Sequence, residues 1–561
     1  LAGNLLTRTL ANGATLSVAY DSMTRPIRQV NALGGVTEIE YDLLGRITRV
    51  TDPLGADTAY TYDKNGNLLT VTDALGNVTS YAYDALGRLI FETAPNGGVT
   101  RYAYDNTGNL LSIMDALGGV TRDQYDENGN LVAMTDALGE TVSLEYNPNG
   151  SATTAIKKNG GVLATGYDKA GRVVSETDAN GHTTKYSYSR NGLVTKITDA
   201  LGQQASFAYD VLGNLVKITA PGKAITLYEY DSAGRVLSMT DPEGCVTEYG
   251  YNENSQIARM TVNGNATLYE YDAAGNIAAV TDAEGRRVEF AYDPNGNLTG
   301  IVYPDGTKDT TQYDALGRVL KNTPRTGLAT AYEYDVVGNI VSVTRGEQAT
   351  RYAYDILGRM VAVTAPDGTE TAYTYDALGN LTGETDPLGN VTAFAYTAES
   401  LLEKVTYANG TTQSLTYDPA GNVTAETDAE GNTKEYQYDK VNRLTAVIDE
   451  LGNKTSYKYD ALDNIAQVTD ALKHITRYTY DKNGNLLTET DALGNRVRYA
   501  YTPEGWLESI TKADGTVLTF EYDKTGSLLT QHVGDGQTVE SSYNDTGSGT
   551  EVSSAEGTIV Y

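Results

Sequence analysis

The chain of 561 residues contains a single cysteine, Cys245, so no disulfide can form within it. No apolar run approaches the roughly 18 residues that a transmembrane helix needs, and we expect no membrane insertion by this segment. Phenylalanine and tryptophan are scarce, at 5 and 1 residues. A chain with a large core would use more phenylalanine. These absences predict a thin structure with much two-sided surface.

Basic residues are also few, because 42 Lys and Arg stand against 73 Asp and Glu, a formal net charge of −31. Nucleic-acid binding depends on neutralising phosphates with Lys and Arg, so this charge argues against a nucleic-acid partner. An anionic membrane surface is disfavoured for the same reason. The negative charge does favour solubility and discourages sheets from pairing edge to edge.

Tyrosine, in contrast, is abundant at 43 residues, and most of it follows one period. A motif tyrosine recurs from Tyr20 to Tyr543 in 25 steps, and all steps are 21 residues except two steps of 20 that end at Tyr271 and Tyr354. A fixed period is the signature of a repeat architecture. We therefore predict one continuous array over residues 1–561, of about 26 repeats, with no internal domain boundary.

One period reads as two strands and two turns. Tyrosines alternate with polar residues over 60–62, as on one face of a strand, and 63–66 has the sequence of a type I turn followed by a bulge glycine. Residues 68–72 form a second strand, 73–77 a second turn of the same design, and 78–83 the next strand. The fold class predicted is all-β, with two antiparallel strands in each repeat.

The residue after the motif tyrosine is Asp in 20 of 26 repeats. In the others it is a side chain that can accept a hydrogen bond from the backbone N–H two residues on: Asn147, Ser189, Asn252, Thr397, Thr502 and Asn544. Glycine stands four residues after the tyrosine in 21 of 26 repeats, with the exceptions Thr24, Ser255, Ser400, Asn442 and Asp463. None of the six substitutes would replace a catalytic acid. The signature is therefore predicted to be geometric, with Asp closing the turn and Gly supplying the bend.

About 52 strands at roughly 4.8 Å spacing would make a strip about 250 Å long. Because sheets twist and curl, such a strip cannot stay open and flat. We expect one continuous spiralling β-strip, which forms a hollow shell or a tube-like solenoid. The repeat pattern does not decide between these forms.

The consensus Y-x-Y-D-x-x-G-[NR]-L, as in residues 81–89, resembles the YD-repeat or Rhs-repeat family over essentially the whole chain. That family includes bacterial Rhs polymorphic toxins, cocoon subunits of insecticidal toxin complexes and teneurin shells. The resemblance implies a spiral β-strip wound into a hollow shell that often encloses a variable C-terminal toxin.

Toxin members of the family carry a terminal D-P-x-G-L motif associated with self-cleavage. Here Asp52–Gly55 and Asp386–Gly389 come close, but Ala56 and Asn390 replace the final leucine, and both segments are in phase with ordinary turns. Because residues 1–6 begin in mid-repeat and the chain stops at Tyr561 before another Tyr-Asp, we expect an excerpt of a longer protein.

No catalytic, cofactor-binding or metal-binding residue is predicted. The turn 63–67 is similar to a calcium loop, but it recurs with neutral substitutions and lacks the distal Glu. No GxGxxG segment opens a helix, so a nucleotide cofactor is not expected. Glutamates at or near one strand position should form a solvated face: Glu92, Glu176, Glu384, Glu426 and Glu489.

The three histidines, His182, His474 and His532, are too far apart in sequence for a zinc site or a triad, and we expect surface or turn positions. Cys245 falls at a turn-to-strand junction and should be an inert thiol. The tyrosine rows are expected to be cross-strand ladders that hold adjacent turns together, with sugar stacking as the alternative.

Two functions remain open. The first is a non-enzymatic, secreted or cell-surface shell that encloses a polypeptide, such as a toxin domain of the same chain. The alternative is an extracellular structural or adhesive protein, which could be filamentous and could bind a cell-surface glycan or protein. A hydrolase would need a candidate site, and the sequence offers none.

Overall fold

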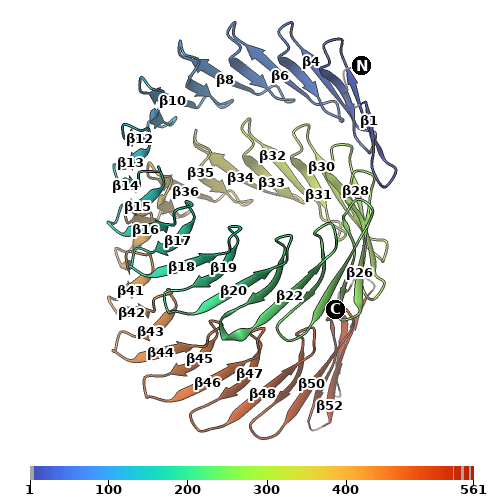
Figure 1. The fold of residues 1–561 in the computed structure, drawn as a ribbon, viewed down its shortest axis with the longest axis vertical. Coiled ribbons are helices and arrows are strands. Elements are labelled where there is room, and N and C mark those ends of the chain that lie inside the picture. Colours follow the sequence, from blue (N-terminus) through green and yellow to red (C-terminus); the bar gives the residue numbers. More distant parts are fainter. Residues whose placement is uncertain (1–5, 535, 545–546, 548, 555–556, 561) are drawn as a thin grey trace. The chain divides into compact units, whose positions relative to one another are not determined.

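The computed structural model describes residues 6–534, 536–544, 547, 549–554 and 557–560; residues 1–5 and Tyr561, considered above, lie outside these. These described residues form 54 strands in one sheet, and each strand pairs antiparallel with its neighbours in sequence (Figure 1). The described residues contain no α-helix, only a 3-10 turn at Pro221–Lys223. None of their helices is long and apolar enough to cross a membrane. The predicted all-β class is confirmed.

The strands, in chain order, are β1 (Thr7–Thr9), β2 (Thr15–Tyr20), β3 (Pro26–Val30), β4 (Val36–Tyr41), β5 (Ile47–Thr51), β6 (Asp57–Tyr62), β7 (Leu68–Thr72), β8 (Val78–Tyr83), β9 (Leu89–Thr93), β10 (Val99–Tyr104), β11 (Leu110–Met114), β12 (Val120–Tyr125), β13 (Leu131–Thr135), β14 (Thr141–Tyr146), β15 (Ala152–Ile156), β16 (Val162–Tyr167), β17 (Val173–Thr177), β18 (Thr183–Tyr188), β19 (Val194–Thr198), β20 (Gln204–Tyr209), β21 (Leu215–Thr219), β22 (Ile225–Tyr230), β23 (Val236–Thr240), β24 (Val246–Tyr251), β25 (Ile257–Val262), β26 (Asn265–Tyr271) and β27 (Ile277–Thr281). They continue as β28 (Arg287–Tyr292), β29 (Leu298–Val302), β30 (Lys308–Tyr313), β31 (Val319–Thr323), β32 (Thr330–Tyr334), β33 (Ile340–Arg345), β34 (Gln348–Tyr354), β35 (Met360–Thr364), β36 (Glu370–Tyr375), β37 (Leu381–Thr385), β38 (Val391–Tyr396), β39 (Leu402–Thr406), β40 (Thr412–Tyr417), β41 (Val423–Thr427), β42 (Thr433–Tyr438), β43 (Leu444–Ile448), β44 (Lys454–Tyr459), β45 (Ile465–Thr469), β46 (Ile475–Tyr480), β47 (Leu486–Thr490), β48 (Arg496–Tyr501), β49 (Leu507–Thr511), β50 (Val517–Tyr522), β51 (Leu528–Val533), β52 (Gln537–Tyr543), β53 (Gly549–Ser554) and β54 (Gly557–Val560).

Each ordinary repeat has two five-residue turns. The turn after the motif tyrosine, which we call the YD turn, carries a register shift at the tyrosine itself, so that Tyr62 of β6 opposes Leu68 of β7. The second turn has no such shift, and Thr72 of β7 opposes Val78 of β8. The predicted turn design is confirmed for both turns, because the Gly66 amide donates to the Asp63 carbonyl, the Gly76 amide donates to the Asp73 carbonyl, and both glycines have positive φ. The register shift beside the YD turn is a further bulge, in which β7 has one extra residue.

The two 20-residue steps come from a shorter second turn. Between β25 and β26 the turn is only Asn263–Gly264, both with positive φ, and Val262 opposes Asn265. Between β33 and β34 it is residues 346–347, and Arg345 opposes Gln348. In each case a five-residue turn is shortened to two residues and each flanking strand is one residue longer, so the repeat is one residue shorter. Two-residue hairpins of this kind match the twist of antiparallel strands.

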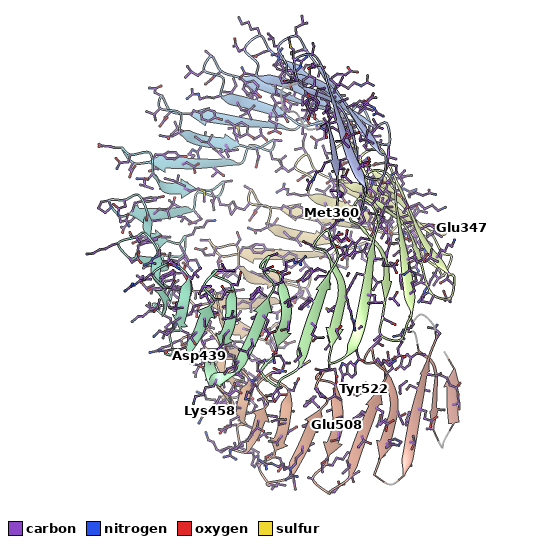
Figure 2. All side chains as sticks on the ribbon, turned by 45° about the vertical axis from the view of Figure 1, so that its right-hand side comes forward. Glu347, Met360, Asp439, Lys458, Glu508 and Tyr522 are labelled. Carbon is purple, nitrogen blue, oxygen red and sulfur yellow. The ribbon has the colours of Figure 1, made fainter. Side chains whose placement is uncertain are left out.

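The sheet has very little core. Among the described residues the buried apolar side chains are Ala224, Cys245, Ala279 and Ala446, and no large side chain is fully buried. Side chains stand on both faces of the ribbon (Figure 2). Most strand residues are half-buried, as the scarcity of phenylalanine predicted. Stability must therefore come mainly from contacts between adjacent strands and repeats.

The chain divides into two compact units. Unit 1 comprises residues 1–144, 270–279 and 288–411, and unit 2 comprises 145–269, 280–287 and 412–561. Each unit therefore contains two long runs of repeats that are distant in sequence. The absence of a domain boundary in the array stays a prediction.

Candidate functional site

The motif aspartate closes its turn with both carboxylate oxygens. Oδ1 of Asp63 accepts hydrogen bonds from the backbone N–H groups of Asn65 at 2.8 Å and Asn67 at 2.9 Å, and Oδ2 accepts one from the Asn67 side chain at 2.9 Å. These bonds, the Asn67 side chain foremost, hold the pKa of Asp63 below its usual value. Because the oxygens are already engaged by the turn, the Asp serves backbone geometry, as predicted.

The substitutes for this aspartate behave in two ways. Asn147 accepts from the N–H groups two and four residues on, and Asn252 does the same, as predicted. For the hydroxyl side chains the prediction of a bond two residues on is wrong. Their oxygens accept from the N–H four residues on, at 3.2 to 3.3 Å, in Ser189, Thr397 and Thr502. A single hydroxyl oxygen on a shorter side chain reaches only the closing amide. The turn of Asn544 includes residues outside the described ones.

The fourth position requires positive φ whatever the residue. Gly66 has φ +97° there. The five predicted exceptions adopt the same left-handed conformation, with φ between 60° and 69°: Thr24, Ser255, Ser400, Asn442 and Asp463. The backbone of the turn is thus set by its hydrogen bonds, and glycine is the residue that adopts it without strain.

The motif tyrosine joins each repeat to the one before it. The hydroxyl of Tyr62 on β6 donates to the carbonyl of Ile47 on β5 at 2.9 Å. The predicted ladder between adjacent turns is confirmed, but its rungs are hydroxyl-to-carbonyl bonds. The same bond is made by Tyr41, Tyr167, Tyr188, Tyr209, Tyr230, Tyr251, Tyr292, Tyr313, Tyr334, Tyr354, Tyr375, Tyr396, Tyr438, Tyr459, Tyr480, Tyr522 and Tyr543.

The fifth turn position supplies a second link, which the sequence did not reveal. Arg88 donates from Nε to Asp84 Oδ2 at 2.7 Å and from Nη1 to the carbonyl of Asp105 in the next repeat at 2.8 Å. Its guanidinium also lies 4.9 Å from the ring centre of Tyr104. The same stacking on the next motif tyrosine recurs at Arg25, Arg46, Arg172, Arg235, Arg318, Arg359 and Arg443.

Trp506 occupies this same fifth position. Its ring lies 5.5 Å from that of Tyr522, so an aromatic contact replaces the cation.

The glutamate row is only partly solvated, which corrects the prediction of a solvated face. Glu92, Glu384, Glu426 and Glu489 are half-buried, and Glu176 is exposed. Three of the five accept a hydrogen bond from the first tyrosine of a neighbouring Y-x-Y pair: Glu92 from Tyr102, Glu176 from Tyr186 and Glu426 from Tyr436. The hydrogen bond that the Tyr186 hydroxyl donates to Glu176, at 2.5 Å, together with burial, raises the pKa of Tyr186 to about 12.

Two of the three histidines lie in turns and the third lies on a strand. His182 and His474 stand at the fifth position of second turns, as predicted, and His474 Nδ1 lies 2.9 Å from Asp470 Oδ2. His182 also lines a cavity of about 470 Å³ in unit 2, together with Glu176 and Lys440. His532 lies on β51 instead, half-exposed, with Nδ1 at 3.0 Å from Thr538 Oγ1.

Cys245 lies at the turn-to-strand junction before β24, as predicted, and it is buried. This burial, and to a smaller extent the negative charges of Asp241 and Glu504, raises the pKa of its thiol. A raised pKa disfavours the reactive thiolate. Within the described part of the chain, His, Cys, Asp and Glu side chains do not gather in threes as a metal site requires. The absence of catalytic, cofactor and metal residues stays a prediction.

In unit 1, the second turns of residues 6–144 meet YD turns about 12 repeats later. The Asn31 side chain donates to the carbonyl of Pro294 at 2.9 Å, and the Asn295 side chain donates to Asp52 Oδ2 at 2.6 Å. One YD turn thus lies between two consecutive second turns. Asn96 makes an equivalent bond to the carbonyl of Ile356 at 3.0 Å. We call this contact the seam.

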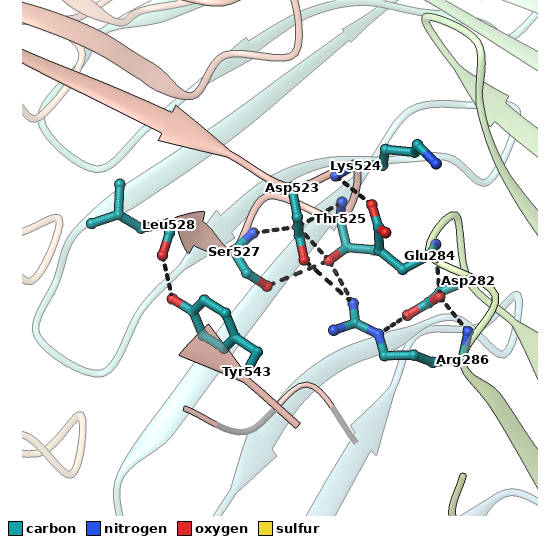
Figure 3. Close-up of polar contacts among 9 residues, drawn as sticks. All are labelled: Asp282, Glu284, Arg286, Asp523, Lys524, Thr525, Ser527, Leu528 and Tyr543. Carbon is teal, nitrogen blue, oxygen red and sulfur yellow. Dashed lines mark hydrogen bonds and ion pairs between the residues drawn. The ribbon is translucent and has the colours of Figure 1, made fainter. Parts of the chain in front are cut away.

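Unit 2 contains a seam of the same kind (Figure 3). The backbone N–H of Lys524 donates to Glu284 at 2.9 Å, and Arg286 donates to the Thr525 hydroxyl at 2.6 Å. Arg286 also lies 3.8 Å from the Asp523 carboxylate. Further bonds of this seam join Lys157 and Asn159 to Pro419, Asn180 to Asp418, and Asn483 to Asp241. In both units the side chains and backbone of the turns therefore make the contact.

Comparison with known proteins agrees with this repeat geometry. The RHS Repeat family model matches repeatedly along the chain, at residues 41–78, 62–93, 83–120, 125–162, 167–204, 188–225, 209–248, 230–267, 251–287, 271–308, 313–350, 375–412, 396–433, 417–454, 438–475 and 480–517. A comparison with curated protein sequences gave no match.

Two solved structures share the fold. One is the crystal structure of TcdB2-TccC3-Cdc42, at 17% identity and TM-score 0.53, covering 94% of this chain and 34% of the other. The second is TcdB2-TccC3 without its hypervariable C-terminal region, at 16% identity and TM-score 0.52, covering 96% and 34%. The chain therefore spans about a third of the length of these structures. From the matches along its repeats, the chain belongs to the RHS repeat family.

Proposed function

We propose that this array is a non-catalytic wall that encloses a polypeptide, namely a C-terminal region of the longer protein to which these repeats belong. The observation that carries the proposal is that the side chains repeated every 21 residues make hydrogen bonds within the sheet itself. The tyrosine hydroxyls bond to carbonyls of the preceding repeat, and the aspartates close turns. The groups that recur every 21 residues thus build a continuous sheet, which suits a barrier.

The seam gives further support. A strip of antiparallel strands leaves its turns at two long margins, and a barrier requires those margins to be joined. In each unit the second turns of one run hold the YD turns of the other through direct hydrogen bonds. A stalk or fibre made of one extended run would not need this contact.

The enclosed partner is proposed from the structural neighbours. One of them is described as TcdB2-TccC3 without its hypervariable C-terminal region. By analogy, the segment enclosed here would follow the repeats in the same chain. Such a protein would act outside the cell or at a bacterial cell surface, where a shielded effector is delivered.

Limited proteolysis tests enclosure. The longer protein is digested beside its C-terminal region expressed alone, and the lifetime of that region is followed by mass spectrometry. Enclosure predicts at least a tenfold longer lifetime in the whole protein. Equal lifetimes would refute the proposal, as would a longer protein that consists only of repeats and a surface anchor.

The alternative, an adhesive surface, predicts saturable binding of the purified array to a glycan panel and filaments by electron microscopy. The tyrosine hydroxyls that could recognise sugars are instead bonded to backbone carbonyls, as in Tyr62 and Tyr480. This engagement favours the wall.

A further inference from the structure

One hydrogen bond recurs at the tips of second turns along the seam of unit 2. Glu243 accepts it from the backbone N–H of Lys482 at 2.8 Å. Glu284 accepts it from the backbone N–H of Lys524 at 2.9 Å (Figure 3). In each pair the glutamate is the third residue of its second turn and the lysine is the second residue of its YD turn. The two pairs are two repeats apart, so the repeat between them should make the same bond.

The repeat between these two pairs lacks both partners of this bond. Its second turn is shortened to Asn263–Gly264, so it has no third residue. Its YD turn at 502–506 has Pro503 as the second residue, and proline carries no N–H. The Asn263 side chain donates instead to Glu504 Oε1, at the longer distance of 3.3 Å. Two changes on opposite sides of the seam therefore open it at the same place.

A cavity of about 400 Å³ lies at this opening, and all of its lining belongs to unit 2. Its polar and aromatic walls come from the shortened hairpin and the turns around it: Asn265, Thr267, Asp282, Glu504, Trp506 and Lys524. Small-molecule sites in proteins occupy roughly 300–1,000 Å³ and combine an apolar or aromatic surface with a few polar groups. The cavity has this size and this composition.

Trp506, the only tryptophan of the chain, forms one wall of the cavity. Its ring lies 5.5 Å from that of Tyr522. It also packs so closely against Gly526 that a Cβ atom there would come within 2.8 Å of the indole Cε2. The indole is thus fixed in position by its neighbours, and the cavity persists beside it. Trp506 therefore lines the opening and does not close it.

Three polar side chains around Trp506 keep their hydrogen-bonding groups available. Among the described residues, Asn265, Thr267 and Lys524 make no side-chain hydrogen bond to another protein group. The Lys524 ammonium takes part in none of the contacts drawn in Figure 3. An amide, a hydroxyl and an ammonium thus offer donors to a ligand in the cavity.

The charges of the cavity nearly cancel. Asp282 is paired with Arg286, whose Nε lies 2.6 Å from the carboxylate Oδ2. This pairing leaves the Glu504 carboxylate against the Lys524 ammonium. An anion would therefore meet Glu504 and a cation would meet Lys524. An uncharged ligand can bond to both side chains without adding an unpaired charge.

We infer that this cavity binds a neutral saccharide of one or two rings, with the C–H face of one ring packed on the Trp506 indole. A sugar ring has an apolar face and a rim of hydroxyl groups, so it requires an aromatic surface surrounded by donors and acceptors. Asn265, Thr267 and Lys524 donate to its hydroxyl oxygens, and Glu504 accepts from its hydroxyl groups. Such a site does not depend on whether the array encloses a polypeptide.

Fluorescence of the purified 561-residue chain tests this site, because the only tryptophan of the chain is Trp506 in the cavity wall. The probes are four neutral disaccharides: maltose, cellobiose, lactose and diacetylchitobiose. Sorbitol, which has the hydroxyl groups but no ring, is the control ligand, and N-acetylarginine amide is a cationic one. At least one disaccharide should change the emission saturably, whereas sorbitol and the arginine amide should not.

Variants locate the binding. Asn265→Leu with Thr267→Val removes two donors at nearly constant volume, retains Trp506 as the reporter and should weaken binding at least tenfold. The matched control, Gln348→Leu with Thr350→Val, changes the same two positions of the other shortened hairpin, in unit 1, and should bind as the wild type does. Trp506→Ala, followed by equilibrium dialysis of the radiolabelled disaccharide, should also bind at least tenfold more weakly. All three should retain the β-sheet circular dichroism of the wild type.

A wild-type emission that no disaccharide changes saturably would overturn the inference, as would an equal response to sorbitol. Saturable binding of the arginine amide in place of the sugars would assign the cavity to a cationic peptide side chain and would overturn it too. Folded cavity variants that bind like the control would place the sugar elsewhere and reject this site. None of these results bears on enclosure, which limited proteolysis measures separately.

Discussion

The hydroxyl of Tyr62 donates to the carbonyl of Ile47, 15 residues earlier in the chain, at 2.9 Å. The ring of the same tyrosine lies under the guanidinium of Arg46, at 4.7 Å from its centre. One tyrosine is therefore held by the repeat before it through both its edge and its face. This double link explains how a sheet with almost no buried core can hold its repeats in register.

Removal of one hydroxyl should weaken one junction. Tyr62→Phe should lower the free energy of unfolding of its region by about 1 kcal/mol, the net value of one hydrogen bond. Tyr62→Ala should cost about 3 kcal/mol or more, because the half-buried ring is lost as well. Urea unfolding measures both. Leu43→Ala, at a bare turn tip, is the control and should change stability by less than about 0.5 kcal/mol.

The turn aspartate should be replaceable by asparagine but not by alanine. Asp335 accepts from the backbone N–H groups of Val337 at 3.0 Å and Asn339 at 2.9 Å. Asp335→Ala leaves these donors without their acceptor and should cost about 1–2 kcal/mol. Asp335→Asn retains an acceptor oxygen, as Asn147 does in its own repeat, and should cost less than half as much. Equal losses in urea unfolding would contradict this role.

The array should lose stability in acid. The Asp105 pKa falls to about 2, because Thr107 and then the Asn109 turn amide and side chain donate to the carboxylate. A carboxyl with a lowered folded pKa adds stability above its unfolded value of 3.8, and this stability is lost as pH falls through the folded pKa. The melting temperature, followed by circular dichroism, should therefore fall between about pH 4 and pH 2. A melting temperature that is constant over this range would exclude the mechanism.

Tyr186 should titrate late in alkali. Its hydrogen bond to Glu176, then burial, raises its pKa to about 12. Because the folded pKa lies above the usual value of about 10, its stabilising contribution is complete below pH 10 and is lost as pH rises toward 12. The difference in absorbance at about 295 nm between wild type and Tyr186→Phe gives its midpoint. Glu176→Gln should shift that midpoint down, and an unchanged midpoint would rule out the bond as the cause.

The local structure and the tyrosine ladder followed from the sequence, but the other contacts between repeats did not. The alternation at Tyr62 and the turn residues after it predicted strands and turns correctly, because both depend on neighbours in sequence. Arg88 bonds to a carbonyl 17 residues on, and Asn295 to a carboxylate 243 residues away. These hydrogen-bond partners depend on how neighbouring strands align and on which distant repeats come into contact. The sequence of a single 21-residue repeat contains neither kind of information. The prediction of a solvated glutamate face was wrong for the same reason, since Glu92 accepts a hydrogen bond from Tyr102 on the neighbouring strand.

Strain at one turn should remain local. Gly66 has φ +97° with no atom near the place of a side chain, so Gly66→Val should cost about 1 kcal/mol or more through backbone strain alone. Hydrogen exchange by mass spectrometry should show lost protection only in adjacent repeats. Gly66→Asn is the control and should cost less, since Asn442 adopts φ 63° at the same position. Loss of protection along the whole chain would contradict the modular array.

Electron cryomicroscopy of the purified chain tests most directly the central claim that each repeat is hydrogen-bonded to the next in one continuous sheet. We expect density for a continuous strip of antiparallel strands, with a tyrosine ring at each junction between repeats. Separate globules joined by flexible linkers, or helical density, would contradict the account.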